Sequence, residues 1–419
     1  MLLLYNLGIR IYWCLAHVAA SFYPKAKLWL AGRRQWHPRL QRAMAQLQVR
    51  PVWVHCSSLG EFEQGRPLIE AIKARNPQQP VVLSFYSPSG YEVRKGYPLA
   101  DYVCYLPLDT RRNAQRFVET LNPSLAIFVK YEFWYHMLGA LNGAKVPTYV
   151  VSAIFRPQQV FFKSYGRWYR RFLQRFTHLF VQDEQSVELL RGIGICNATA
   201  CGDTRFDRVA AIARSADTIP EVERFCALEP HRPVLVAGST WPPDEELLAA
   251  YMRTSPGLRL IIAPHEVHDA HLRLVEQRFG FAGTVRYTQL RDGSFPSTGA
   301  RVLIVDTIGL LAAIYRYGQV AYVGGGFGVG IHNTLEAAVY GMPVLFGPNY
   351  RRFNEAVGLL AHGGAFVVDG PVALARSLDG LLSSPEHLAH SAEASRRYVQ
   401  SMTGATQAVM AAIDGALKL

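Results

Sequence analysis

A glycine-dense run followed by polar residues is the first part of this chain whose residue types could do chemistry. The run covers residues 324–330, and the polar segment after it is Asn333, Thr334, Leu335 and Glu336. We predict a buried strand over 319–323, a glycine loop, and a helix over 334–340. Backbone N–H groups at such a corner can face a phosphate. Glu336, about one turn further on, is placed to accept hydrogen bonds from a ribose. The glycines lack the G-x-G-x-x-G spacing of a dinucleotide site.

An acidic residue at a second corner is the other candidate. Residues 52–56 read as a buried strand, residues 57–60 as a turn, and Glu61 stands just before a helix. A carboxylate there can serve as general base for an acceptor hydroxyl, a role that contributes typically ~10²–10⁴-fold. A Glu is also favourable at a helix N-terminus for structural reasons alone. The local sequence supports both interpretations equally.

Short apolar runs alternate with helical stretches from residue 50 onward, and these elements must position both corners. Strands are predicted at residues 52–56, 81–85, 125–129, 148–151, 179–181, 234–237, 258–263, 302–305, 320–323 and 344–346. Alternating strands and helices indicate parallel sheets covered on both faces. The predicted fold class is therefore α/β, with two doubly wound Rossmann-like domains facing a cleft. Ligands are expected at the carboxyl ends of the strands.

The domain boundaries follow from composition. We predict an N-terminal helix over residues 1–30, a first Rossmann-like domain over 31–214 and a second over 215–419. The break falls in the proline-bearing stretch 210–233. The final helix, about residues 391–419, is a candidate for packing back on the first domain.

The net charge of +12 is distributed unevenly. The first sixty residues contain no Asp or Glu, and a second acid-free stretch mixes basic and aromatic residues over 161–176. Such a mixture suits nucleic acid or an anionic membrane surface, but no nucleic-acid-binding signature is visible. We therefore expect a membrane partner, with Arg167, Arg170 and Arg171 facing phosphates and the aromatics at the headgroup level. The alternative is a solvated basic helix that packs its aromatics inward.

The N-terminal segment is apolar enough to enter a membrane. Residues 1–23 approach the roughly 20 apolar residues needed to span, and no positively charged region precedes them as in a signal peptide. Asn6, Arg10 and His17 fall within about 40° on a wheel of 100° per residue, a narrow polar stripe typical of a helix lying in the interface. We predict a monotopic anchor; a helix docked on the protein's own domain is the alternative. The six cysteines lack metal-site spacing and are expected as reduced thiols.

Several blocks together resemble one known family. They are Ser57-Ser58-Leu59-Gly60-Glu61, GSTWPPDEE at 238–246, VDTIGLL at 305–311 and GGGFGVGIHNTLEAAVYGMPVLFGP from Gly324. In order and spacing the chain is similar to the 3-deoxy-D-manno-octulosonic acid (Kdo) transferases of lipopolysaccharide synthesis. The resemblance implies a GT-B fold at the cytoplasmic face of the bacterial inner membrane, held by a monotopic or single N-terminal anchor. It implies transfer of Kdo from CMP-β-Kdo to a lipid A precursor with inversion, and neither metal nor further cofactor.

The resemblance also implies roles for individual residues. Glu61 matches the proton acceptor, and Glu132 and Arg205 match residues that stabilise the transition state. Positions that match the CMP contacts are Pro264, His265, Ile308, Gly309, Leu310, Asn333, Thr334, Leu335 and Glu336. Arg205 and His265 depart from the Lys and Arg common at these positions, and imidazole titrates near pH 6.5. The alternatives are a membrane-associated UDP-sugar transferase and a nucleotide-sugar-binding or epimerase-like protein that transfers nothing.

Overall fold

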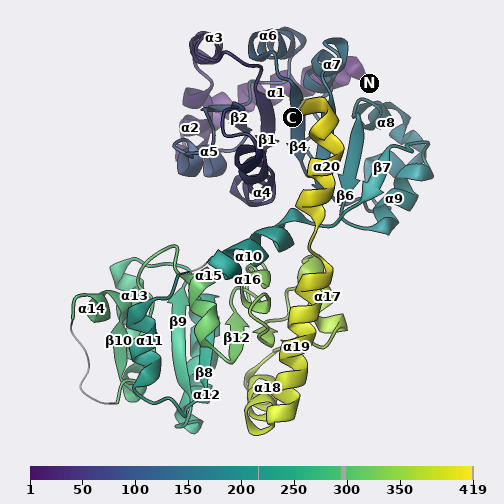
Figure 1. Cartoon of the computed structure of the whole chain (residues 1–419). Coiled ribbons are helices and arrows are strands. Elements are labelled where there is room, and N and C mark those ends of the chain that lie inside the picture. Colours follow the sequence, from purple (N-terminus) through teal and green to yellow (C-terminus); the bar gives the residue numbers. More distant parts are fainter. Residues whose placement is uncertain (216, 294–298, 418–419) are drawn as a thin grey trace. The chain divides into compact units, whose positions relative to one another are not determined.

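The computed structural model describes residues 1–215, 217–293 and 299–417, and these divide into two compact units (Figure 1). The first unit comprises Met1–Arg208 and Thr403–Leu419, and the second comprises Val209–Met402. Each unit is built on a parallel seven-stranded sheet. The prediction of two doubly wound α/β domains is thereby confirmed.

The sheet of the first unit has the strand order β3-β2-β1-β4-β5-β6-β7. Its strands are β1 (Val52–Cys56), β2 (Val81–Phe85), β3 (Tyr102–Tyr105), β4 (Leu125–Val129), β5 (Thr148–Ala153), β6 (His178–Val181) and β7 (Ala198–Ala200). Because β1, β2 and β4 are buried on both faces, they read as mostly apolar runs, interrupted by His55 in β1 and Ser84 in β2. The order of the strands reverses between β1 and β4, which is where doubly wound folds bind ligands.

Helices cover both faces of this sheet (Figure 1). They are α1 (Leu2–Ala19), α2 (Pro24–Gly32), α3 (Trp36–Met44), α4 (Leu59–Arg75), α5 (Pro88–Arg94), α6 (Arg111–Leu121), α7 (Tyr135–Gly143), α8 (Arg167–Leu173), α9 (Glu184–Arg191), α10 (Thr204–Ser215) and α20 (Ala405–Leu417). One core cluster joins the sheet to α3, α6, α7, α8 and α9, and a second joins it to α4 and α20. Each half of the core thus takes alternate residues of every strand.

The second unit repeats the plan with the strand order β10-β11-β9-β8-β12-β13-β14. Its strands are β8 (Val234–Thr240), β9 (Arg259–Pro264), β10 (Thr284–Arg286), β11 (Val302–Ile304), β12 (Val320–Val323), β13 (Val344–Phe346) and β14 (Ala365–Val367). Its helices are α11 (Pro220–Ala227), α12 (Pro242–Thr254), α13 (Asp269–Phe279), α14 (Tyr287–Arg291), α15 (Leu311–Ile314), α16 (Leu335–Ala338), α17 (Asn354–Ala361), α18 (Pro371–Ser383) and α19 (Pro385–Ser401). Here the order reverses between β8 and β12.

The end of the chain differs from the single helix predicted over 391–419. Two helices occupy this stretch, α19 in the second unit and α20 in the first. Gly404, whose φ of +113° favours glycine, lies between them, directly before α20. α20 packs on α4, where Asp414 lies 2.5 Å from Arg75. The units meet in sequence at Arg208–Val209, inside α10 and six residues before the boundary predicted at 214/215.

Candidate functional site

Glu61 lies in the first turn of α4, directly after β1. Ser58 is the N-cap of this helix, and the two residues form a capping box in which the Ser58 N–H donates to Glu61 Oε2 at 3.0 Å. The Ser58 hydroxyl contacts the same oxygen. Glu61 therefore stabilises the N-terminus of α4, the structural role considered for it from the sequence. Both contacts use Oε2, so Oε1 stands outside the cap.

Glu132 lies in the loop after β4, on the other side of the switch point. Its Oε2 is 2.9 Å from His55 Nε2 and accepts the Trp134 indole N–H at 2.8 Å. Burial acts to raise the pKa of Glu132, but the hydrogen bonds from His55, Trp134 and Ser57 outweigh it and lower the pKa below its ordinary value. Glu132 is therefore ionised at neutral pH. An ionised carboxylate can stabilise developing positive charge, but it has no proton to donate.

The two carboxylates share one neighbour. Cys56, the last residue of β1, is fully buried. Burial raises the pKa of the Cys56 thiol, and the negative charges of Glu61 and Glu132 raise it further. Both acids thus act on one atom at the carboxyl end of β1. The structure brings together at one switch point two residues that are 71 positions apart in the sequence.

Arg205 lies in the first turn of α10 and is held by a buried carboxylate. Asp203 accepts hydrogen bonds from Arg205 Nε at 2.9 Å and from its Nη2 at 2.8 Å. Burial acts to raise the pKa of Asp203, but Arg205 and Gln64 lower it below its ordinary value. Gln64 Nε2 donates to Asp203 at 2.9 Å from α4, the helix that carries Glu61. Part of the positive charge of Arg205 is therefore offset by a structural partner.

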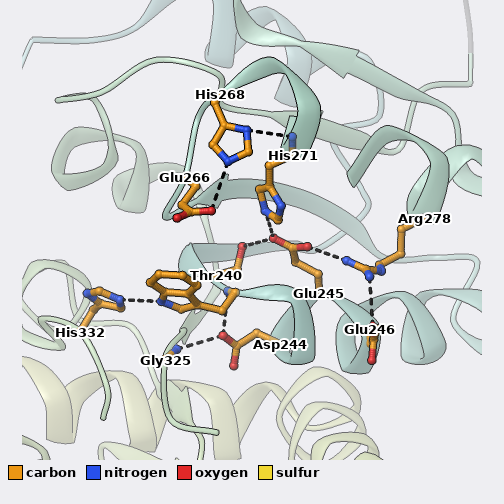
Figure 2. Close-up of polar contacts among 11 residues, drawn as sticks. Thr240, Asp244, Glu245, Glu246, Glu266, His268, His271, Arg278, Gly325 and His332 are labelled. Atoms are coloured by element: carbon orange, nitrogen blue, oxygen red, sulfur yellow. Dashed lines mark hydrogen bonds and ion pairs between the residues drawn. The ribbon is translucent and has the colours of Figure 1, made fainter. Parts of the chain in front are cut away.

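In the second unit, the glycine loop follows β12 and is packed against backbone on both sides. A Cβ on Gly324 would lie 2.4 Å from the Ser239 carbonyl oxygen, and one on Gly326 would lie 2.5 Å from the Gly347 backbone. The Gly325 N–H donates to Asp244 Oδ2 at 2.9 Å (Figure 2). Close backbone packing thus requires the first glycines of the run, independently of any phosphate.

The helix after this loop is shorter than predicted. α16 spans Leu335–Ala338, a single turn, rather than residues 334–340. Gly341, with a φ of +71°, follows shortly after its end. A one-turn helix aligns few peptide dipoles, so its macrodipole can contribute little to anion binding. Individual N–H groups of the loop are the remaining backbone donors.

Asn333 and Glu336 contact one another at the start of α16. The Asn333 side-chain N–H₂ donates to Glu336 Oε1 at 3.0 Å, and its Oδ1 accepts the Leu335 N–H at 3.1 Å. Asn333 therefore caps the helix. Thr334 and Leu335 are fully buried, whereas Asn333 and Glu336 are half-buried. Nucleotide binding by Asn333 and Glu336 stays a prediction.

Three aromatic rings stack beside the glycine loop, each after a different strand. The His265 ring stacks on Trp241 with centroids 4.5 Å apart and on His332 at 4.6 Å. The Trp241 indole N–H donates to His332 Nε2 at 3.1 Å, the contact drawn beside His332 in Figure 2. Burial lowers the pKa of His332, and nearby His265 lowers it further, so His332 is neutral at neutral pH. Trp241 and His332 were not predicted as site residues.

A hollow lies next to this stack. Its volume is about 250 Å³, and it is lined by Trp241, Pro242, Pro243, Asp244, Gly325, Phe327, Gly328 and Val329. Pro264, the last residue of β9, is buried, and His265 after it is exposed. The β9 corner and the glycine loop thus meet in the stack.

The turn at Ile308–Leu310 stands at the surface of the second unit, after β11. The Ile308 side chain is 88% exposed, unusual for an isoleucine. Gly309 has a φ of +97°, and Leu310 is the N-cap of α15. Asp306, just before this turn, is held by the Thr288 N–H at 3.1 Å. The turn therefore exposes the apolar Ile308 side chain, while the contact of Asp306 with Thr288 holds the residues just before it.

The basic and aromatic segment over 161–176 corrects one prediction. Phe161, Phe172 and Phe176 are buried in the core of the first unit, and Tyr165 alone of its aromatics is exposed. The inward packing considered as the alternative is therefore the observed one. Arg170 is engaged as well, since its Nε donates to the Phe161 carbonyl at 2.9 Å. Arg167 and Arg171 are exposed.

Helix α1 has one face on the first unit and the opposite face exposed. The Tyr5 hydroxyl donates to Asp109 at 2.5 Å, and Asn6 Oδ1 lies 2.7 Å from His136 Nε2. Its most exposed apolar side chains are Leu3, Leu4, Leu7, Ile11, Leu15 and Val18. They fall within about 120° of a helical wheel, opposite the half-buried Tyr5 and Ile9. By length and composition α1 could cross a membrane. In this structure it packs on the first unit through Tyr5 and Asn6, and its exposed face is apolar.

Comparison with known proteins agrees with these features. Residues 34–208 match the family model of 3-deoxy-D-manno-octulosonic-acid transferase (kdotransferase). The chain is 28% identical to the 3-deoxy-D-manno-octulosonic acid transferase of Aquifex aeolicus, over 79% of this chain and 86% of that protein. It is 27% identical to that of Bordetella pertussis, over 92% and 94% of the two chains.

Solved structures confirm the fold. A putative UDP-N-acetylglucosamine 2-epimerase from Listeria monocytogenes aligns with a TM-score of 0.60 at 14% identity, over 88% of this chain and 97% of that chain. UDP-GlcNAc 2-epimerase from Neisseria meningitidis aligns with a TM-score of 0.60 at 14% identity, over 86% and 98%. At this identity the likeness concerns the fold alone.

Two Rossmann-like units, with acidic residues at one switch point and a glycine loop at the other, have the architecture of the GT-B fold. The family-model match and the relatives that align over most of its length make the chain similar to the Kdo transferases, which are glycosyltransferases.

Proposed function

We propose that this enzyme transfers Kdo from CMP-β-Kdo to a lipid A precursor, lipid IVA, with inversion at the anomeric carbon. The observation that carries the proposal is the pair Glu61 and Glu132 at the β1–β4 switch point of a chain similar to the Kdo transferases. One carboxylate has an oxygen outside its helix cap, and the other is held ionised by hydrogen bonds. These two states suit a general base and a charge stabiliser, respectively.

The reaction is a single in-line displacement. Glu61 takes the proton from a glucosamine 6-hydroxyl as that oxygen attacks the anomeric carbon of Kdo, and the bond to the CMP phosphate breaks. One displacement inverts the configuration. Glycosyl transfer develops positive charge in an oxocarbenium-like transition state, which the ionised Glu132 stabilises. Arg205 stabilises the negative charge on the reacting groups. Its pairing with Asp203 reduces the positive charge that is available for this role.

The nucleotide is assigned to the second unit. Asn333 and Glu336 hold phosphate and ribose, with Thr334 and Leu335 contributing backbone. Ile308, Gly309 and Leu310 read a pyrimidine through their backbone. Pro264 and His265 complete the site, with His265 held by the stack on Trp241 and His332. A departing CMP carries one phosphate, so oriented N–H groups can serve in place of a divalent metal.

We expect CMP to bind without Mg²⁺ and more tightly than UMP, and Glu336→Ala to weaken it by about 1–3 kcal/mol, the cost of leaving buried polar groups unpaired. Calorimetry in the presence of EDTA measures both. Asn333→Ala serves as the comparison, because it removes the α16 cap as well, and its melting temperature separates loss of the helix from loss of a ligand contact. Tighter binding of UDP than of CMP, or a requirement for a divalent ion, would favour a UDP-sugar transferase instead.

The first unit is assigned to the cytoplasmic face of the inner membrane. α1 is held along its unit by Tyr5 and Asn6, so its exposed leucines are available to lie in the interface as a monotopic anchor. The exposed Arg167 and Arg171 are assigned to phosphates of the acceptor or of anionic lipids. Arg170 supports the segment through its carbonyl contacts.

A further inference from the structure

A fully buried histidine stands behind Glu132. His55 lies on β1, 0% exposed, with its Nε2 2.9 Å from Glu132 Oε2. Its Nδ1 is 2.8 Å from the hydroxyl oxygen and 3.2 Å from the carbonyl oxygen of Ser84 on the neighbouring strand β2. That hydroxyl also accepts the Trp53 indole N–H at 2.7 Å. A continuous polar chain therefore runs from Trp53 through Ser84 and His55 to Glu132.

The carboxylate fixes the proton at one end of this chain. An ionised carboxylate only accepts, so His55 Nε2 carries the hydrogen that points at Glu132. At the other end, Nδ1 has a Ser84 oxygen as its partner whether it accepts the hydroxyl hydrogen or donates its own. Every member thus has a partner, and a fully satisfied buried network fixes one geometry. The register of β1 with β2 pairs His55 with Ser84, so this geometry is built into the sheet.

We propose that His55 is a positioning residue for the transfer reaction. It acts through Glu132 by holding that carboxylate ionised and at a fixed orientation, and Ser84 fixes the His55 ring in turn. The inference rests on the proposed function, in which Glu132 stabilises positive charge. Trp134 is a second donor on the same oxygen. The other titratable groups around the pair are Glu61, Cys56 and Tyr86.

Two substitutions separate the contacts of His55. The amide of His55→Asn falls near Nδ1 and can reach Ser84 but not Glu132. The amide of His55→Gln reaches toward the position of Nε2 and can still donate to Glu132. We expect His55→Asn to lower kcat about 10- to 100-fold, the rate equivalent of one hydrogen bond to a charged group, and His55→Gln to recover most of that loss. KM for CMP-Kdo should change less than about two-fold in both.

Two further readouts distinguish positioning from a general loss of structure. Loss of the His55 hydrogen bond raises the pKa of Glu132, so the acid limb of the kcat profile should move to higher pH in His55→Asn. In a double-mutant cycle, His55→Asn should cost little once Glu132 is already Gln, since the interaction it removes is gone. His271→Asn is the matched control, because the His271 Nε2 lies 2.9 Å from the buried Glu245, a pair of the same kind (Figure 2).

The experiment is steady-state transfer from CMP-Kdo to a tetraacylated lipid A precursor between pH 5 and 9, with each variant's melting temperature recorded. Equal kcat in His55→Asn and wild type, additive losses with Glu132→Gln, or an equal effect in His271→Asn would each overturn the positioning role while leaving the function in place. Wild-type protein that transfers nothing would overturn both.

Discussion

Glu61→Gln should fold normally, still bind CMP, and lose at least ~10²-fold in kcat, the usual contribution of a general base. The structure makes this substitution a clean test. Glu61 is the N3 residue of a capping box with Ser58, and Gln is equally compatible with that motif. The helix cap is therefore kept while the proton acceptor is removed.

The complementary variant is Ser58→Ala. It removes the cap at a cost of about 0.5–2 kcal/mol in stability but leaves the Glu61 carboxylate present. Melting temperature and single-turnover transfer rate, measured for both variants, separate the two roles of Glu61. More than about a tenth of the wild-type rate in Glu61→Gln would exclude Glu61 as the base.

Membrane binding should depend on the exposed face of α1. Replacing Leu4, Leu7 and Leu15 with Gln removes three exposed apolar side chains, and burial of each is worth roughly 1.5–3 kcal/mol when complete. We expect the loss to exceed ~3 kcal/mol, which is more than ~100-fold in vesicle partitioning. Liposome flotation measures it, and the docking contacts of Tyr5 and Asn6 are untouched.

The charge contribution is tested separately with Arg167→Ser/Arg171→Ser. This pair should weaken binding to anionic vesicles by about 1 kcal/mol per residue and leave binding to neutral vesicles unchanged. Arg170 is kept because its guanidinium supports the Phe161 carbonyl. Full flotation of the leucine variant would show that α1 merely covers its own unit.

The fold was predictable because its signals are local. Strands such as Val81–Phe85 and Leu125–Val129 are short, mostly apolar runs, as expected in a sheet buried on both faces. The Ser58-x-x-Glu61 spacing is likewise a local signature of a helix start. The length of α16 was not predictable in the same way, because its end is set by the turn at Gly341 and by packing around it.

The site residues that sequence reasoning did not find depend on contacts between residues far apart in the sequence. His55 and Glu132 meet because β1 pairs with β4, and nothing in the sequence around either residue indicates the other. The stack of Trp241, His265 and His332 comes from the ends of three strands. The prediction that the aromatics over 161–176 lie at the headgroup level was wrong, because an apolar side chain suits a lipid surface and a protein core equally.

The most direct test is transfer by the purified protein in the presence of EDTA. CMP-Kdo or UDP-GlcNAc is supplied with a tetraacylated lipid A precursor, and the lipid product is read by mass spectrometry. The account predicts that the precursor gains Kdo from CMP-Kdo, with release of CMP, and gains nothing from UDP-GlcNAc. Transfer from UDP-GlcNAc, or consumption of either donor with no change in the lipid, would contradict it.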